Sequence, residues 1–188
     1  MRPGWEERWR EFHRPVVVGR LWVGPPWEPP DERLLPVVIE PGRAFGTGAH
    51  ATTRLCLELL QGLPPASILD VGCGSGVLAI AAAVLGHRPV TAVDADPAAV
   101  EATRENAARN SVTVKTRVAD AASDDLPAAD AAVANIALAA VEAIVPRLDV
   151  RAAVTSGYLA HQRPRVRGFR HIDRRFAAEW AADRWERE

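Results

Sequence analysis

Short apolar runs alternate with amphipathic segments along most of the chain. After Pro64 and Pro65, each apolar run ends in Gly, Asp or Asn, and the segment that follows has apolar residues at helical spacing. This alternation of strand and helix is typical of a parallel sheet covered on both faces, so we predict an α/β fold. The expected strands are Ser67–Val71, Pro89–Asp94, Val112–Val118, Asp130–Asn135 and Ala152–Ser156, and the expected helices are Val77–Leu85, Pro97–Arg109 and Ala137–Leu148.

The segments that flank this alternation have different patterns. Residues 1–36 hold four of the six Trp and seven of the fifteen Pro, which favours an arm with one strand, Val16–Val23. Its Trp side chains either pack onto the main body or form an aromatic surface for a ligand. A strand at Val37–Glu40, a loop at 41–50 and a helix at Thr52–Leu60 are expected next.

The last segments of the chain predict an antiparallel hairpin. Phe169–Phe176 and Glu179–Glu186 alternate roughly in polarity around Ala177 and Ala178. We expect this hairpin to close one edge of the sheet.

Length and composition narrow the class of protein. A chain of 188 residues with 48% apolar and 25% charged residues fits one globular domain. Its net charge of −1 gives no sign of a general nucleic-acid surface, so direct nucleic-acid binding is not expected. Two Cys provide neither a disulfide framework nor a metal site, and no run suits a secretion signal or a membrane span. We therefore expect a soluble cytoplasmic protein with no metal and no membrane partner.

The most informative segment is a glycine-rich loop between a predicted strand and a predicted helix. Asp70, Gly72, Gly74 and Gly76 lie at this junction, where glycines let the backbone approach a ligand. Asp94 ends the next strand, at the distance expected for an acid that binds a ribose. The pattern indicates a nucleotide-type cofactor.

Two details favour S-adenosylmethionine over a dinucleotide. The third glycine, Gly76, comes two residues after Gly74. In a dinucleotide fingerprint the third glycine comes three residues after the second. Asp70 also places a carboxylate at the mouth of the loop, where it repels a pyrophosphate but attracts an ammonium and a sulfonium. Asp96, before Pro97, is expected to cap a helix, and Asp120 either contacts the adenine edge or is a plain loop carboxylate.

The motifs together resemble one family of class I methyltransferases. The segment Pro41–Thr53, with the sequence PGRAFGTGAHATT, is similar to that of the bacterial enzymes that methylate protein eleven of the large ribosomal subunit. Ala134-Asn135-Ile136, Ser156-Gly157 and Gly168-Phe169-Arg170 add to the resemblance, which runs from about Trp5 to Glu188. It implies a Rossmann-like, doubly wound, mostly parallel seven-stranded sheet with an antiparallel C-terminal hairpin.

The resemblance also implies roles for individual residues. Thr53, Gly72, Asp94 and Asn135 match cofactor-binding positions, and the neighbouring Asp70, Cys73, Gly74, Gly76, Ala95 and Asp120 complete the expected cofactor site. Phe45 and His50 lie in the segment that borders the acceptor, so with Asn135 they are the candidate catalytic residues. By their residue types alone, His50 is more readily a capping residue than a base, and Asn135 an Asn that begins a loop.

Two departures from the family leave the acceptor open. The chain begins near the family's interdomain linker, so we expect an arm at 1–36, a methyltransferase domain at 37–188 and no N-terminal recognition domain. The stretch between Gly157 and Gly168 is short for a helix and rich in Arg, which marks a docking surface or, more simply, a solvated face. A protein amine, such as one on a ribosomal protein, is the main expected acceptor. A small-molecule methyltransferase and a non-catalytic cofactor-binding module that needs a partner are the alternatives.

Overall fold

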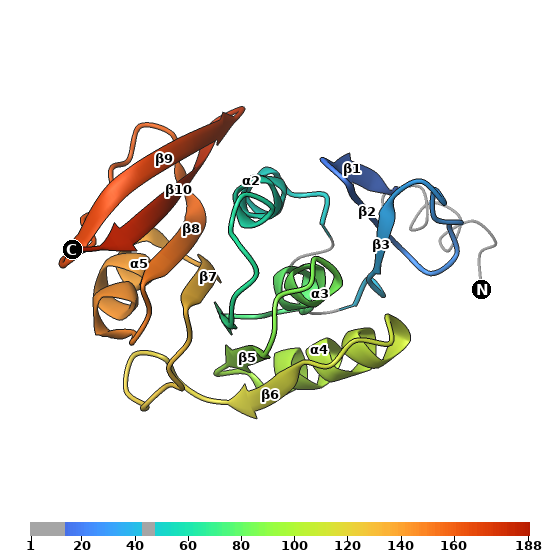
Figure 1. Cartoon of the computed structure of the whole chain (residues 1–188), viewed down its shortest axis with the longest axis horizontal. Helices are drawn as coiled ribbons and strands as arrows, with labels where there is room; N and C mark the ends of the chain where they lie inside the picture. The colour runs from blue at the N-terminus through green and yellow to red at the C-terminus, as the bar shows by residue number, and fades with distance from the viewer. Residues whose placement is uncertain (1–13, 43–47) are drawn as a thin grey trace, which may run out of the picture.

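A twisted seven-stranded sheet forms the centre of the molecule (Figure 1). The structure is a computed structural model that describes residues 14–42 and 48–188. The strand order is β6-β5-β4-β7-β8-β10-β9, in which the first five strands are parallel and β10 runs antiparallel to both of its neighbours. The strands are β4 (Ile68–Val71), β5 (Val90–Asp94), β6 (Lys115–Val118), β7 (Ala131–Asn135), β8 (Ala152–Leu159), β9 (Phe169–Ala177) and β10 (Trp180–Arg187).

Helices cover the two faces of this sheet unequally. One face packs against α2 (Ala51–Leu60), α3 (Val77–Val84) and part of α4 (Pro97–Arg109), whose apolar side chains form one core cluster. The other face is covered by α5 (Leu138–Ile144), the 3-10 helix η1 (Val145–Arg147) and irregular segments. Every residue from Val77 to Ala83 is buried, since α3 lies between the sheet and a smaller sheet.

That smaller sheet corrects the prediction for the N-terminal segment. One strand was expected over Val16–Val23, but the chain forms β1 (Val16–Val18) and β2 (Leu21–Gly24), an antiparallel pair. The two-residue turn between them begins at Gly19, whose φ of +56° suits a tight hairpin. An unbroken apolar run on both sides hid this turn, so the single-strand prediction is wrong.

The third strand of the small sheet, β3 (Leu35–Val38), pairs in parallel with β2. The boundary predicted between residues 36 and 37 therefore falls inside β3, and the division into an arm and a domain at that point stays a prediction. Trp22 is buried, as expected for a Trp that packs onto the main body.

Elsewhere the structure confirms the predicted α/β fold and its C-terminal hairpin, with shifted boundaries. The strand expected from Val112 begins only at Lys115, and the helix expected to reach Leu148 becomes a 3-10 turn at Val145, next to Pro146. Proline explains the second change, because it has no N–H to continue the α-helical bonding.

The short stretch between β8 and β9 contains no helix, as its length suggested. Arg174 of β9 holds this segment in place by donating hydrogen bonds to the carbonyl oxygens of Ala160 (3.0 Å) and Gln162 (2.7 Å). The same guanidinium contacts the buried carboxylate of Asp183, which also accepts a 2.7 Å hydrogen bond from Tyr158. These hydrogen bonds fix the short stretch to the C-terminal hairpin.

Candidate functional site

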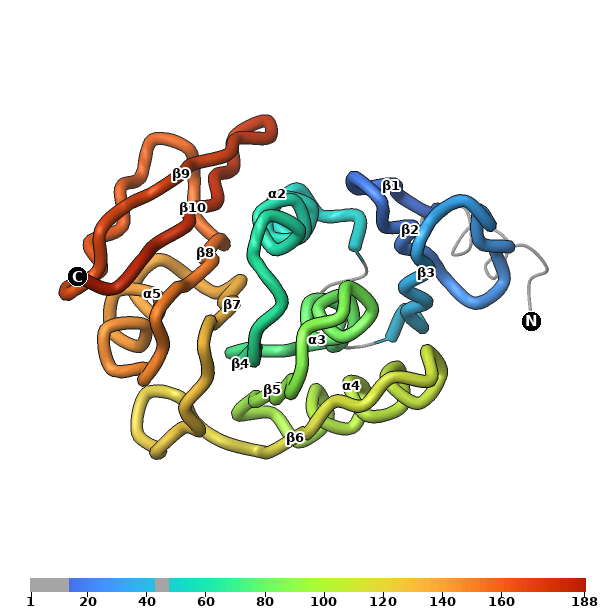
Figure 2. The backbone as a smooth tube through the Cα atoms, in the orientation of Figure 1, coloured from blue at the N-terminus to red at the C-terminus, as the bar shows by residue number. Residues whose placement is uncertain are grey.

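The carboxyl ends of five parallel strands meet at one edge of the sheet. The chain goes from β4 outward to β5 and β6, then returns through a long loop to β7 on the other side of β4 (Figure 2). The neighbouring strands β4 and β7 are thus followed by connections in opposite directions. Ligands of open α/β sheets bind at such a switch point, beyond the carboxyl ends of the strands.

Two glycines let the backbone close tightly around Ile136 at this switch point. A Cβ on Gly157 would lie 2.2 Å from the Ile136 carbonyl oxygen, and one on Gly72 would lie 2.6 Å from Ile136 Cγ2. Both glycines have positive φ, +103° and +72°. Residues with a Cβ fit neither the space nor the conformation, so the shape of this edge depends on glycine at both positions.

The carboxylate of Asp94 organises the glycine-rich loop. Its two oxygens accept 3.0 Å hydrogen bonds from the backbone N–H groups of Gly74 and Asp96. A carboxylate oxygen can accept two hydrogen bonds, so each keeps a lone pair for a ligand. Asp96 caps α4 by accepting from Ala98 N at 2.8 Å, as its position before Pro97 predicted.

Polar side chains of α4 hold the other side of this loop. Gly76, with φ of +83°, begins α3, and a Cβ there would come within 3.0 Å of Thr103. The Thr103 hydroxyl donates to the Gly74 carbonyl oxygen, and the Asn106 amide donates to that of Ser75 at 2.9 Å. Sequence reasoning missed these residues, although Thr103 and Asn106 are polar positions at helical spacing on a face that should be apolar.

Asp70 is fully buried beneath α3, rather than at the mouth of the loop. One carboxylate oxygen accepts a 3.0 Å hydrogen bond from Ala79 N, whereas the other, Oδ1, has no hydrogen-bond partner among the residues that the structure describes. Burial, and to a smaller extent the nearby charge of Asp94, raise the pKa of Asp70 to about 7, against the smaller opposing effect of the Ala79 hydrogen bond. The site therefore contains a buried acid that titrates near neutral pH.

Asn135 and the start of α2 come together as expected. The Asn135 side-chain amide donates to the Thr53 hydroxyl at 3.3 Å, which links the end of β7 to α2. His50 is the N-cap of α2: its Nδ1 accepts from Thr52 N at 3.3 Å and lies 2.8 Å from the Thr52 hydroxyl oxygen. The capping interpretation of His50 is confirmed, and capping does not prevent a role in the site.

Trp180 joins the C-terminal hairpin to the same region. Its ring meets the His50 ring edge-on, with the centroids 5.0 Å apart. No local signal in the sequence identifies this residue, because its contact with α2 depends on how β10 pairs with β8.

The remaining predicted residues differ in their surroundings. Ala95 is exposed beside Asp94, and Asp120 is exposed in a turn, where it accepts from Ala122 N at 2.9 Å. The Cys73 thiol is buried against Thr103, so only the backbone of Cys73 can face a ligand. Burial raises the pKa of this thiol to about 12. Phe45 lies outside the described residues.

Within residues 14–42 and 48–188, no group of three His, Cys, Asp or Glu side chains is placed to hold a metal ion. Over the same residues, the structure has no helix with the length and apolar character needed to cross a membrane.

Comparison with known proteins decides the family. The family model "Ribosomal protein L11 methyltransferase (PrmA)" matches residues 2–187. The chain belongs to the ribosomal protein L11 methyltransferase family. It is 45% identical over 161 residues to the L11 methyltransferase of Symbiobacterium thermophilum, covering 83% of this chain and 53% of that protein. It is 42% identical over 190 residues to that of Pseudomonas putida GB-1, covering 95% and 61%.

A solved structure agrees with the family assignment. The crystal structure of the ribosomal protein L11 methylase from Lactobacillus delbrueckii subsp. bulgaricus superposes with a TM-score of 0.82 at 27% identity, covering 94% of this chain and 100% of that one. The class I methyltransferase fold is therefore shown for this member of the L11 methyltransferase family. The chain spans about half the length of the curated relatives it matches.

The close approach at Ile136 gives a testable prediction. Gly157→Ala should lower the free energy of unfolding by at least about 2 kcal/mol, because it adds both a backbone clash and an unfavourable φ. Gly62→Ala is the matched control, since its Cβ would lie 3.4 Å from the nearest backbone atom. Urea denaturation of both variants measures the difference. Equal stabilities would show that the edge does not depend on Gly157.

Proposed function

We propose that this protein is a methyltransferase that binds S-adenosylmethionine at the carboxyl edge of its sheet and methylates an amine of a protein acceptor. The observation that carries the proposal is the buried carboxylate of Asp70, which keeps one unpartnered oxygen beneath the glycine-rich loop at the switch point. A buried acceptor of this kind is costly unless a donor or a positive charge meets it. Membership of the L11 methyltransferase family supports the same reaction class.

The residues of the loop fit this cofactor better than a dinucleotide. Backbone N–H groups at the start of a helix bind pyrophosphate when they are available. Here the N–H groups of Gly74, Gly76, Val77 and Ala79 already donate within the protein, two of them to the carboxylates of Asp94 and Asp70. A cationic ligand suits an edge where these N–H groups are already used and where the carboxylates keep further lone pairs.

The predicted cofactor residues can be given separate tasks. Asp94 offers acceptor lone pairs to both ribose hydroxyls, and the exposed Ala95 lies next to it without blocking access. Gly72 and Cys73 line the loop with backbone. Asp120 can offer a carboxylate oxygen to the adenine side while its Oδ1 accepts from Ala122 N within its own turn.

Asn135, Thr53, His50 and Trp180 form the side of the site assigned to the acceptor. The Asn135 amide donates to Thr53, which fixes the side chain and leaves its carbonyl oxygen to orient an attacking amine. The edge contact of Trp180 holds the ring of His50 at the start of α2. These residues position the amine and help to exclude water.

Methyl transfer from S-adenosylmethionine requires few further groups of the protein. When bound, S-adenosylmethionine supplies a methyl group on a sulfonium, whose sulfur leaves as a neutral thioether. The chain must align a neutral amine with that methyl group, and the proton of the ammonium product can pass to water. A strong base is not needed, so we assign His50 to positioning.

A protein of the large ribosomal subunit is the acceptor we favour, because the matched relatives are named for ribosomal protein L11. The chain covers about half of those relatives, so recognition of that acceptor is part of the proposal.

Cofactor binding can be tested with paired variants. Asp94→Ala and Gly72→Val should abolish binding of S-adenosylmethionine in calorimetric titrations, since the first removes the ribose acceptor and the second fills the loop. Asp96→Ala is the matched control: it removes a helix cap worth about 1 kcal/mol two residues away and should leave affinity within about threefold. Wild-type affinity in Asp94→Ala and Gly72→Val would contradict the site.

Transfer is tested by incubating the protein with methyl-labelled cofactor, first with ribosomal proteins and then with small metabolites. We expect label on one ribosomal protein, measurable transfer by His50→Ala, and a loss of at least about tenfold in kcat for Asn135→Ala at unchanged cofactor affinity. Label on small molecules alone would favour a small-molecule methyltransferase. Cofactor binding without any label would favour a non-catalytic binding module.

A further inference from the structure

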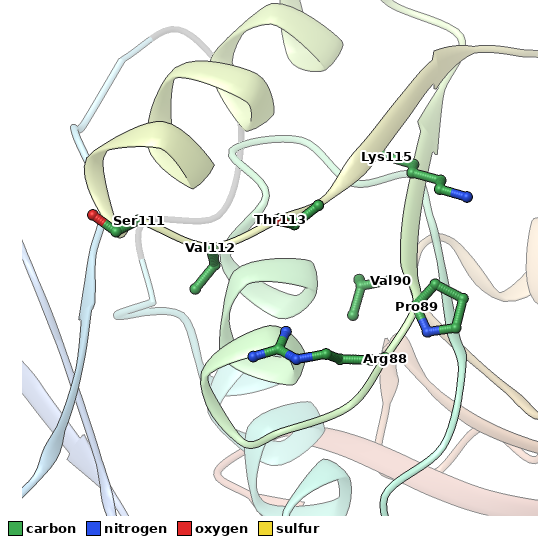
Figure 3. Close-up of a pocket in the computed structure, with 7 residues that line it drawn as sticks. All are labelled: Arg88, Pro89, Val90, Ser111, Val112, Thr113 and Lys115. Carbon is green, nitrogen blue, oxygen red and sulfur yellow. The ribbon is translucent and has the colours of Figure 1, made fainter.

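The opposite edge of the sheet contains a hollow that the proposed function does not use. It lies at the amino ends of β5 and β6, away from the glycine-rich loop, and has a volume of about 530 Å³ (Figure 3). Pro89, Val90 and Val112 provide apolar lining, and Ser111 and Thr113 provide hydroxyl groups. Its size falls within the range of small-molecule sites.

Two cations complete the lining of this hollow. The Arg88 side chain extends across it toward Val112, while Lys115 stands on the β6 side with its ammonium directed away from Arg88 (Figure 3). Lys115 is the only lysine of the 188 residues. No carboxylate lines the hollow, and among the described residues neither cation has an ion-pair partner.

The absence of a partner distinguishes this hollow from a second one at the same edge. That second hollow contains Arg151, Arg184 and Arg187. Arg184 pairs with Glu186 at 2.8 Å, and Arg187 donates to the carbonyl oxygens of Val150 and Leu148. The carboxylates of Asp130 and Glu186 line this second hollow beside its three arginines, whereas no carboxylate lines the first.

The helices α3 and α4 offer one explanation without a ligand. Both end at this edge of the sheet, and the partial negative charge of a helix C-terminus attracts a cation. However, Arg109 already occupies the last turn of α4. A helix terminus also gives no reason for hydroxyls and an apolar surface to line the same space.

We propose that this hollow binds a phosphate group carried by an organic ligand. A guanidinium donates in a planar fork that matches phosphate oxygens, and a flexible lysine adds a second positive charge. Thr113 lies between Val112 and Lys115 and adds a hydroxyl to the lining, and Val90 and Val112 can contact an organic body (Figure 3). A small organic phosphate and the backbone of an RNA strand share this chemistry.

Because Lys115 is the only lysine, its rate of chemical modification reports on ligand binding in the hollow. The rate at which an acetylating reagent modifies Lys115 is followed by mass spectrometry, with saturating S-adenosylhomocysteine present so that the carboxyl edge is occupied. Ribose 5-phosphate at ten times its Kd should slow the reaction about tenfold, whereas ribose should not protect. A short uridine oligoribonucleotide is the second arm; protection by it alone, lost steeply with salt, would identify RNA as the source of the phosphate.

Variants separate the site from general surface charge. Arg88→Gln should remove most of the protection, and Arg20→Gln, an exposed arginine at the turn between β1 and β2, should leave it intact. Thermal unfolding confirms that both variants are folded. The proposal is overturned if neither phosphate probe protects Lys115, if ribose protects equally, or if Arg88→Gln has no effect. Methyl-transfer activity does not enter this test, so the two proposals fail independently.

Discussion

The burial of one carboxylate at the centre of the sheet constrains the rest of the site. Asp70 lies in β4, a strand that is buried on both faces, and among the described residues its carboxylate accepts one hydrogen bond, from an N–H of α3. Its other oxygen has no partner there, and burial raises the pKa of the carboxyl to about 7. A structure that carries this cost at its switch point is prepared for a positively charged ligand.

Much of the main fold could be predicted because its signals are local. Glycines at a strand-to-helix junction, Asp before Pro at the start of α4, and alternating apolar runs each depend on a few neighbouring residues. The same holds for Asp94 and the glycine-rich loop. The hairpin at β1 and β2 was missed because only Gly19 and Arg20 interrupt an otherwise apolar run.

The unpredicted parts depend on contacts between distant residues. Trp180 reaches His50 only because β10 pairs with β8, and Asn106 reaches Ser75 only because α4 packs beside α3. Asp70 was expected at the mouth of the loop, but tertiary packing buries it beneath α3. The sequence pattern locates the loop, whereas tertiary packing decides which of its polar groups a ligand can still contact.

The pKa of Asp70 tests this account most directly. Carbon-13 NMR of the labelled Asp70 carboxyl, titrated without cofactor, should show a midpoint near pH 7, because burial raises the pKa from its ordinary value of 3.8. Saturating S-adenosylmethionine should move the midpoint to lower pH, since a nearby positive charge favours the carboxylate. A midpoint near 4 in the free protein would contradict the burial of this carboxyl, and a midpoint that does not move when the cofactor binds would contradict the assignment of this edge as the cofactor site.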